Sequence, residues 1–234
     1  MNFFEKIGES LYKTLIENDN YMLLLKGLGN TLLLAFFAII IGIVIGVIVA
    51  IGKVASADNK KLFIIKWLCN IYINIIRGTP VYVQMLIIYF CILPLLQSRN
   101  AMLAGAVTFG VNSGAYVAEI IRAGILSIDK GQSEAGRSLG LGQFQTMKLI
   151  VMPQAIKNIL PALGNEFIVL IKETAIVGNI TVYDLTKSAE RISSFTFDVF
   201  TPLLVISLVY LIVVLGLTKL LNVFERRLAK SDRR

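Results

Sequence analysis

Long apolar runs separated by short charged stretches dominate the sequence, and they predict membrane-spanning helices. Such a helix needs about 20 mostly apolar residues, because the hydrocarbon core is about 30 Å thick and each residue rises about 1.5 Å. Five segments fit this pattern, at residues 27–51, within 62–96, and at 101–125, 155–176 and 199–223. The second is longer than one span and is broken near residues 77–80. We therefore expect an all-α integral membrane protein with about five transmembrane helices.

Small residues mark one face of the first predicted span. Ala38, Gly42, Gly46 and Ala50 recur at four-residue spacing and form a smooth strip along the helix. In membranes such strips let two helix backbones approach closely. We expect another span to pack against this one.

Composition and charge support a membrane protein and exclude other classes. Hydrophobic residues make up 56% of the chain and charged residues 16%, against typical values of about 45–50% and about 25%. The net charge is +8, but the basic residues lie at the ends of apolar segments, so we expect no nucleic-acid partner. Cys69 and Cys91 are far apart and histidine is absent, which argues against a metal site.

The distribution of basic residues predicts the topology. Segments 53–77, 122–157 and 219–234 hold 16 of the 23 Lys and Arg, and five spans place all three segments on one side. The positive-inside rule makes that side cytoplasmic, with the N-terminus outside and the C-terminus in the cytoplasm. The expected organisation is an external segment at 1–26, a membrane domain at 27–223 with a cytoplasmic loop at 127–152, and a basic tail at 224–234 that contacts membrane lipid.

The loop at 127–152 is too short to build its own core, so it must rest on another surface. Residues 132–139 predict a short helix that Gly140 closes in the left-handed conformation. Ala135 and Leu139 share one face of that helix, as an apolar knob on a polar loop. A second short helix, at 143–152, is expected to end at Pro153. Without further information, the simplest role of the loop is to join two helices.

The same loop resembles the EAA loop of ABC importer permeases. The matching residues are Glu134-Ala135-Gly136, Gly140 and Ile150-Val151-Met152-Pro153, with Gly136 in place of an alanine and Met152 in place of a leucine. Several flanking elements resemble the polar amino-acid branch of that family: Arg77-Gly78-Thr79-Pro80 with Gln84 (RGTPxxxQ), Ala115 to Arg122 (AYxAEIxR), Ser127 to Gln132 (SIPKGQ, with Asp129 for proline), Lys172-Glu173-Thr174, and Glu190 to Phe197. Their common order makes the resemblance specific.

This resemblance implies a type I ABC importer permease that moves polar amino acids, basic ones included, across the cytoplasmic (inner) membrane. The chain lacks a G-x-x-x-x-G-K-[ST] loop, so a separate cytoplasmic ABC ATPase would bind the ATP, and the chain itself would be non-catalytic with no cofactor. Glu134, Ala135, Gly136, Leu139 and Gly140 would couple to that ATPase. The other implied partners are a second permease copy, with a homodimer preferred to a pair of homologues, and an extracellular amino-acid-binding protein.

Polar residues inside the spans are candidates for contact with substrate, because a central charge costs about 2.5–3.5 kcal/mol and therefore faces a cavity or a partner. Spacings of three and four place Asn112, Ser113, Tyr116 and Glu119 along one helix face. Asn165, Glu166 and Gln84 complete the candidate substrate-binding set. The alternative is structural: Glu119 pairs with Arg122, and a neighbouring helix satisfies Glu166. Arg77, Gly78, Thr79 and Pro80 predict a kink that is a candidate gate, because proline cannot donate the helical hydrogen bond.

Two other functions compete with an ABC permease. A self-sufficient channel or secondary transporter typically shows internal repeats or paired broken helices, and the sequence shows no such duplication. An intramembrane enzyme would need a nucleophile and base, but neither G-x-S-x-G nor H-E-x-x-H occurs.

Overall fold

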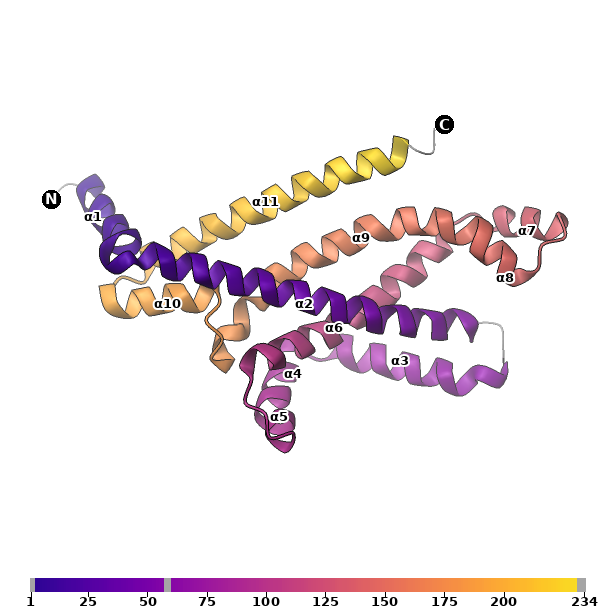
Figure 1. The fold of residues 1–234 in the computed structure, drawn as a ribbon, viewed down its shortest axis with the longest axis horizontal. Coiled ribbons are helices and arrows are strands. Elements are labelled where there is room, and N and C mark those ends of the chain that lie inside the picture. The colour runs from indigo at the N-terminus through magenta and orange to yellow at the C-terminus, as the bar shows by residue number, and fades with distance from the viewer. Residues whose placement is uncertain (1–2, 57–59, 231–234) are drawn as a thin grey trace.

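The computed structural model describes residues 3–56 and 60–230, and all regular elements in these ranges are helical. In chain order they are α1 (Phe3–Leu15), η1 (Glu17–Asp19), α2 (Asn20–Ala55), η2 (Lys60–Leu62), α3 (Phe63–Gly78), α4 (Val81–Ile87), η3 (Ile88–Ile92), α5 (Leu93–Leu95), α6 (Ala101–Leu126), α7 (Lys130–Ser138), α8 (Gln143–Thr146), η4 (Met147–Val151), α9 (Met152–Glu173), η5 (Thr174–Ile180), α10 (Leu185–Thr196) and α11 (Phe200–Lys230). The molecule is elongated, with α1 and α10 at one end and α7 and α8 at the other (Figure 1).

The predicted spans appear as long helices. In the described part of the chain, α2, α6 and α11 are long and apolar enough to cross a membrane, and α3 with α4–α5 qualifies only as a pair bent by 103°. The fourth predicted span, α9, has 22 residues, but polar residues such as Lys157, Asn165 and Glu166 interrupt its apolar run. It nevertheless packs along α6 and α11. The all-helical membrane fold is confirmed, and the span at 155–176 stays a prediction.

Helices α2 and α6 interlock through glycines on both helices. A Cβ atom on Gly46 would overlap Val117, and one on Gly42 would lie 3.0 Å from the side chain of Ser113. The relation also runs the other way, because a Cβ on Gly110 would lie 2.6 Å from Ile41 and one on Gly114 would lie 2.8 Å from Ile45. Each helix therefore inserts two side chains over two glycines of its neighbour. The small strip on α2 was predicted, whereas its counterpart on α6 was not.

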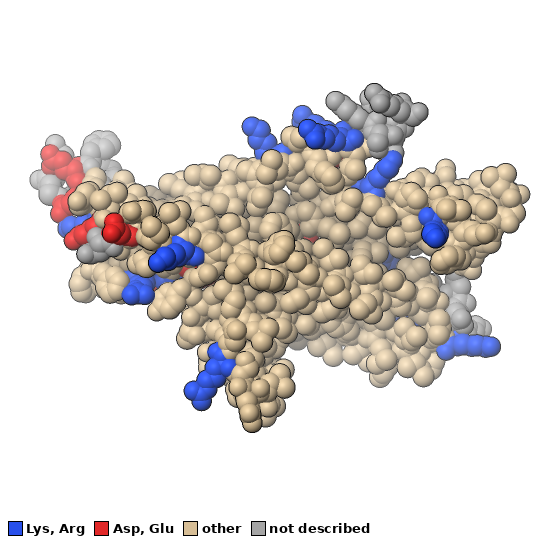
Figure 2. Space-filling model, in the orientation of Figure 1, with Lys and Arg blue, Asp and Glu red and all other residues tan. Residues whose placement is uncertain are grey.

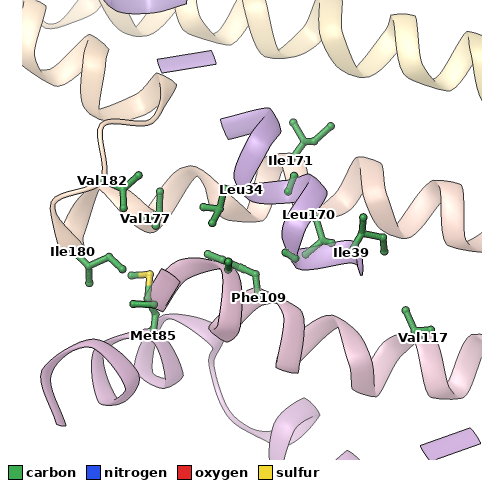
Figure 3. Packing of buried hydrophobic residues seen from close by; sticks show 14 of the residues in the cluster. Leu34, Ile39, Met85, Phe109, Val117, Leu170, Ile171, Val177, Ile180 and Val182 are labelled. Atoms are coloured by element: carbon green, nitrogen blue, oxygen red, sulfur yellow. The ribbon is translucent and has the colours of Figure 1, made fainter. Parts of the chain in front are cut away.

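The largest buried cluster extends this contact to the other helices. Phe109 of α6 is fully buried and lies between Leu34 of α2, Met85 of α4 and the turn η5 (Figure 3). Leu170 and Ile171 close the cluster from α9 (Figure 3). Because four helices and η5 meet here, the break between α3 and α4 is held against the same core as the long spans.

Helix α10 fills the end of the molecule opposite α7. Buried Asp184 caps it, since its carboxylate accepts hydrogen bonds from the backbone N–H of Lys187 (2.9 Å) and Thr186 (3.2 Å). Burial raises the pKa of Asp184 above its usual value, although these backbone bonds oppose the rise. The hydroxyl of Thr31 accepts from the N–H of Leu185 (3.1 Å) and so fastens α10 to α2.

Helix α1 is tied to the start of α11. The Ser10 hydroxyl donates to Asp198, which also accepts from the N–H of Phe200 (2.9 Å). The Ser10 hydrogen bond lowers the pKa of the Asp198 carboxyl. On the face shown in Figure 2, charged atoms gather at the two ends, along the C-terminal half of α11 and on the α4–α5 arm, and the centre of the face is almost free of charge. This pattern suits a bilayer around the middle of the bundle.

The glycine interlock predicts that Gly46→Val destabilises the protein, because the added side chain overlaps Val117. We expect a loss of about 1–3 kcal/mol, the usual cost of overpacking. The measurement is thermal unfolding of the purified protein in detergent. The control is Gly29→Val on the same helix, where an added Cβ meets nothing within 4 Å. Equal losses for the two variants would contradict the interlock.

Candidate functional site

The chain breaks between α3 and α4 at the predicted kink. Gly78 ends α3, Thr79 is extended at φ −122° and ψ 146°, and α4 begins after Pro80. Proline disfavours a helical conformation in the residue before it, and its missing N–H cannot continue the α3 ladder. The Thr79 hydroxyl donates to the carbonyl of Ile75 (2.8 Å), which closes the last turn of α3.

Gln84 joins the two sides of this break to α6. Its amide nitrogen donates to the carbonyl of Ile76 (2.9 Å), to the hydroxyl of Thr79 (2.8 Å) and to the carbonyl of Thr79 (3.1 Å). Its amide oxygen accepts from Asn112 of α6 (3.2 Å). The last carbonyls of a helix have no hydrogen-bond donor within the helix, and the Gln84 side chain of α4 supplies donors at this break. In this conformation both Gln84 and Asn112 bind protein groups.

Arg77 stacks on Tyr116. Its guanidinium carbon lies 4.9 Å from the centre of the Tyr116 ring, a cation–π contact between the end of α3 and the middle of α6. The topology count placed Arg77 with the cytoplasmic segment 53–77, whereas α3 carries it along α6 to Tyr116. The candidate gate residues Arg77, Gly78, Thr79 and Pro80 are all exposed.

Ser113 and Glu166 meet between α6 and α9. The Ser113 hydroxyl donates to the Glu166 carboxylate at 2.7 Å. Glu166 is half-buried and forms no salt bridge among residues 3–56 and 60–230. Asn165 is exposed, and its side chain donates to the carbonyl of Pro161 (3.3 Å) on its own helix. The predicted neighbours Asn165 and Glu166 therefore have different surroundings.

Glu119 lies in an ion cluster. Lys53 of α2 approaches one carboxylate oxygen at 2.7 Å, and Arg122 approaches the other at 2.8 Å. The pair with Arg122 was the structural alternative considered from the sequence. Lys53 was missed, and its only sequence signal was a lone cation at the end of the first apolar run. With both oxygens occupied by cations, Glu119 is held as part of the α2–α6 contact.

The candidate residues on α6 therefore face four different neighbours. Asn112 meets α4, Tyr116 meets the end of α3, Glu119 meets α2, and Ser113 meets α9. Sequence reasoning also missed Glu173, which is half-buried seven residues after Glu166 on α9. A spacing of seven puts two residues on the same helix face. That spacing was the available signal for a second carboxylate.

The loop between α6 and α9 forms the short helix α7. The Asp129 carboxylate accepts from the N–H of Gly131 (2.6 Å), so it caps the helix in place of the usual proline. At the other end Gly140 has φ +83°, as predicted, and the N–H of Leu141 bonds to the carbonyl of Gly136 (3.1 Å). Together with the bond from Gly140 to Arg137 (2.9 Å), this is a Schellman cap.

The two faces of α7 differ. Glu134 and Ala135 are exposed, and Leu139 is 81% exposed. Gly136 is buried, and a Cβ there would lie 2.7 Å from the end of Ile150 and 2.9 Å from Thr146. Because Gly136 has no side chain, α7 packs closely against η4, and the apolar knob on its other face stays exposed.

The expected end of the second short helix at Pro153 is wrong. The helix that starts at Gln143 continues through Pro153 into α9. The reason is the π turn η4 (Met147–Val151), in which the N–H of Met152 bonds to the carbonyl of Met147, five residues back. A wider turn accommodates a ring that lacks an N–H. The π turn η3 (Ile88–Ile92) precedes Pro94 in the same way.

These features define a class: a helical membrane component with a discontinuous span and, at one end, an exposed short helix that carries an apolar knob. Residues 42–230 match the family described as "Binding-protein-dependent transport system inner membrane component", and the chain belongs to that family. It is a multi-pass protein of the inner membrane.

Known relatives cover nearly the whole chain. A putative glutamine transport system permease protein of Rickettsia bellii is 41% identical over 90% of this chain and 94% of its own length. An arginine transport system permease protein of Bacillus subtilis is 39% identical over 89% and 94%. A crystal structure of an amino acid ABC transporter with histidines matches with a TM-score of 0.82 at 43% identity, over 97% of this chain and 99% of that one. A methionine ABC transporter in an inward-facing conformation shares the fold, with a TM-score of 0.76 at 20% identity.

The cap at the break predicts that Gln84→Ala loosens α4. The variant leaves the carbonyls of Ile76 and Thr79 without a side-chain partner, at about 1–3 kcal/mol for each unsatisfied group. Hydrogen–deuterium exchange should become faster over residues 76–87. Asn112→Ala removes one of the bonds and should have a smaller effect, and the exposed Gln143→Ala should have none. Unchanged exchange in Gln84→Ala would show that the side chain does not hold the break.

Proposed function

We propose that this chain is the permease subunit of an ATP-driven importer for polar amino acids, and that it admits basic ones. One observation carries the substrate class: Glu166 is a half-buried carboxylate that has a serine partner but no cationic one within residues 3–56 and 60–230. Buried charges are normally paired, so a cationic group of the substrate is the natural partner. Glu173 adds a second negative charge along the same face of α9. The relatives named for glutamine and arginine transport support this class.

The other polar candidates have structural partners in this conformation. Glu119 is held by Lys53 and Arg122, and Gln84 with Asn112 caps the break. The Ser113 hydroxyl lies at Glu166, where its oxygen can still accept a hydrogen bond from a substrate, and Tyr116 and Asn165 are proposed contacts elsewhere along the path. We assign the charge recognition to Glu166 and not to Glu119.

The exposed helix α7 is the surface for the energy source. Ala135 and Leu139 form an apolar knob that a groove on a separate cytoplasmic ATPase would bury, and Glu134 lies beside it. The chain is non-catalytic in this scheme, and the ATP is bound by the partner. Because η4 and α9 continue from the seat of α7 without a loop, a displacement of α7 reaches Glu166 through one continuous helix.

The assembly follows from the family. A second permease, preferably an identical copy, completes the solute path, and an extracellular binding protein delivers the substrate. The excess of Lys and Arg at the α7 end, even without Arg77, supports a cytoplasmic location for that end. On this orientation the segment 1–26 and α10 lie outside, the membrane domain extends over 27–223, and the tail 224–234 is cytoplasmic. Arg77, Gly78, Thr79 and Pro80 form the gate in this arrangement.

The substrate assignment predicts that Glu166→Gln selectively weakens transport of basic amino acids. The variant keeps size and hydrogen bonding but loses a charge contact typically worth about 1.5–3 kcal/mol, or roughly ten- to a hundredfold in affinity. Uptake of arginine and lysine should fall more than uptake of glutamine in assembled transporters. Glu119→Gln is the comparison, because loss of an ion-cluster member should lower assembly and all substrates together. Equal losses for both substrate classes in Glu166→Gln would remove this residue from the substrate site.

The coupling assignment predicts that Gly140→Val uncouples the chain from its ATPase. Valine in the left-handed conformation costs about 1–2 kcal/mol and displaces α7. Folding in the membrane should survive, whereas ATPase binding and transport should fall, as they should for Glu134→Lys. The matched control is Gly142→Ala, since Gly142 has φ −67° and its Cβ would be unobstructed. Normal assembly and transport in Gly140→Val and Glu134→Lys would refute the assignment.

A further inference from the structure

Two basic side chains line a hollow between α2 and α10. Lys26 and Arg191 contribute to a cavity of about 200 Å³ that is also lined by Asn30, Tyr183 and Ser188. Neither cation forms a salt bridge with any carboxylate in the described ranges. Two like charges that share one hollow without a counter-charge favour an anion.

The guanidinium of Arg191 is held in place by aromatic rings. Its central carbon lies 5.5 Å from the ring centre of Tyr183 and 5.7 Å from that of Phe195. Stacking on rings fixes the plane of the group and leaves its N–H edges free. Those edges suit the paired oxygens of a phosphate.

An apolar strip of α2 begins at the same place. Lys26, Leu33, Phe37 and Val44 share one face of the helix, and the three apolar side chains are 46%, 47% and 55% exposed. A soluble anion or an acidic protein side chain would use the two cations but not this strip. A phospholipid would use both, because its acyl chains run along the helix below its phosphate.

A carboxylate lies in the adjoining hollow. Asp19 lines a cavity of about 460 Å³ together with Arg191 and Phe195. Its negative charge disfavours a headgroup with a second negative charge and accommodates an ammonium group. Among the other charged groups of this end, Lys187 and Glu190 pair with each other at 2.8 Å.

We propose that Lys26 and Arg191 bind the phosphate of a membrane phospholipid with an ammonium headgroup, whose acyl chains cover the exposed strip of α2. The site fixes α10 to α2 at the membrane surface. It does not depend on the transported substrate, because it requires only that the chain lies in a bilayer.

The test is native mass spectrometry of the assembled transporter after reconstitution in phosphatidylethanolamine and extraction with detergent. The double variant Lys26→Gln/Arg191→Gln should retain roughly fivefold less phosphatidylethanolamine than the unmodified protein, because both charge-assisted contacts to the phosphate are lost. Arg99→Gln/Lys187→Gln removes the same charge and should retain as much as the unmodified protein. Inorganic phosphate should not displace the lipid.

Equal lipid retention in all three proteins would overturn the proposal. If the Lys26→Gln/Arg191→Gln transporter in nanodiscs then also docked the extracellular binding protein more weakly, the cations would be assigned to an acidic protein surface instead.

Discussion

The close contact between α2 and α6 is the most extensive contact between helices in the described part of the chain, and α3 and α9 pack against both of its members. Lipid tails are as apolar as leucine, so two spans gain little from burying apolar surface and associate mainly through close packing. Here Gly42 and Gly46 admit Ser113 and Val117, while Gly110 and Gly114 admit Ile41 and Ile45. The contact also positions function: Ser113 lies over Gly42 and from there reaches Glu166 on α9.

The irregular backbone segments around this pair lie where protein groups can form hydrogen bonds with their N–H and C=O groups. A membrane contains no water to bond exposed backbone groups, so a broken span must be capped by the protein itself. Gln84 does this at the break after α3, and the π turns before Pro94 and Pro153 let two helices pass a proline without ending. The second π turn lies between the exposed α7 and the carboxylates of α9. In the proposed function, the segment that would receive a partner's movement is thus joined to the segment that would face a solute.

The sequence predicted what depends on local pattern and missed what depends on distant contacts. Apolar runs located the long helices, Pro80 the break, and Gly140 the left-handed cap. Lys53 was missed as the partner of Glu119 because 66 residues separate them, and spacing on α6 could not tell that Ser113 would face α9 while Asn112 faces α4. Pro153 misled because proline normally ends a helix, and a π turn is not readable from residue types. The resemblance of the loop and its flanks to ABC permeases agreed with the family match.

In the proposed function the spans form the path and α7 receives the energy from a separate ATPase. The most direct measurement is uptake of labelled arginine by proteoliposomes that contain the permease, its extracellular binding protein and internal ATP, with and without the ATPase subunit. Uptake should require both the ATPase subunit and hydrolysable ATP, and the permease alone should hydrolyse none. Uptake driven by an ion or solute gradient in the absence of the ATPase would contradict the account.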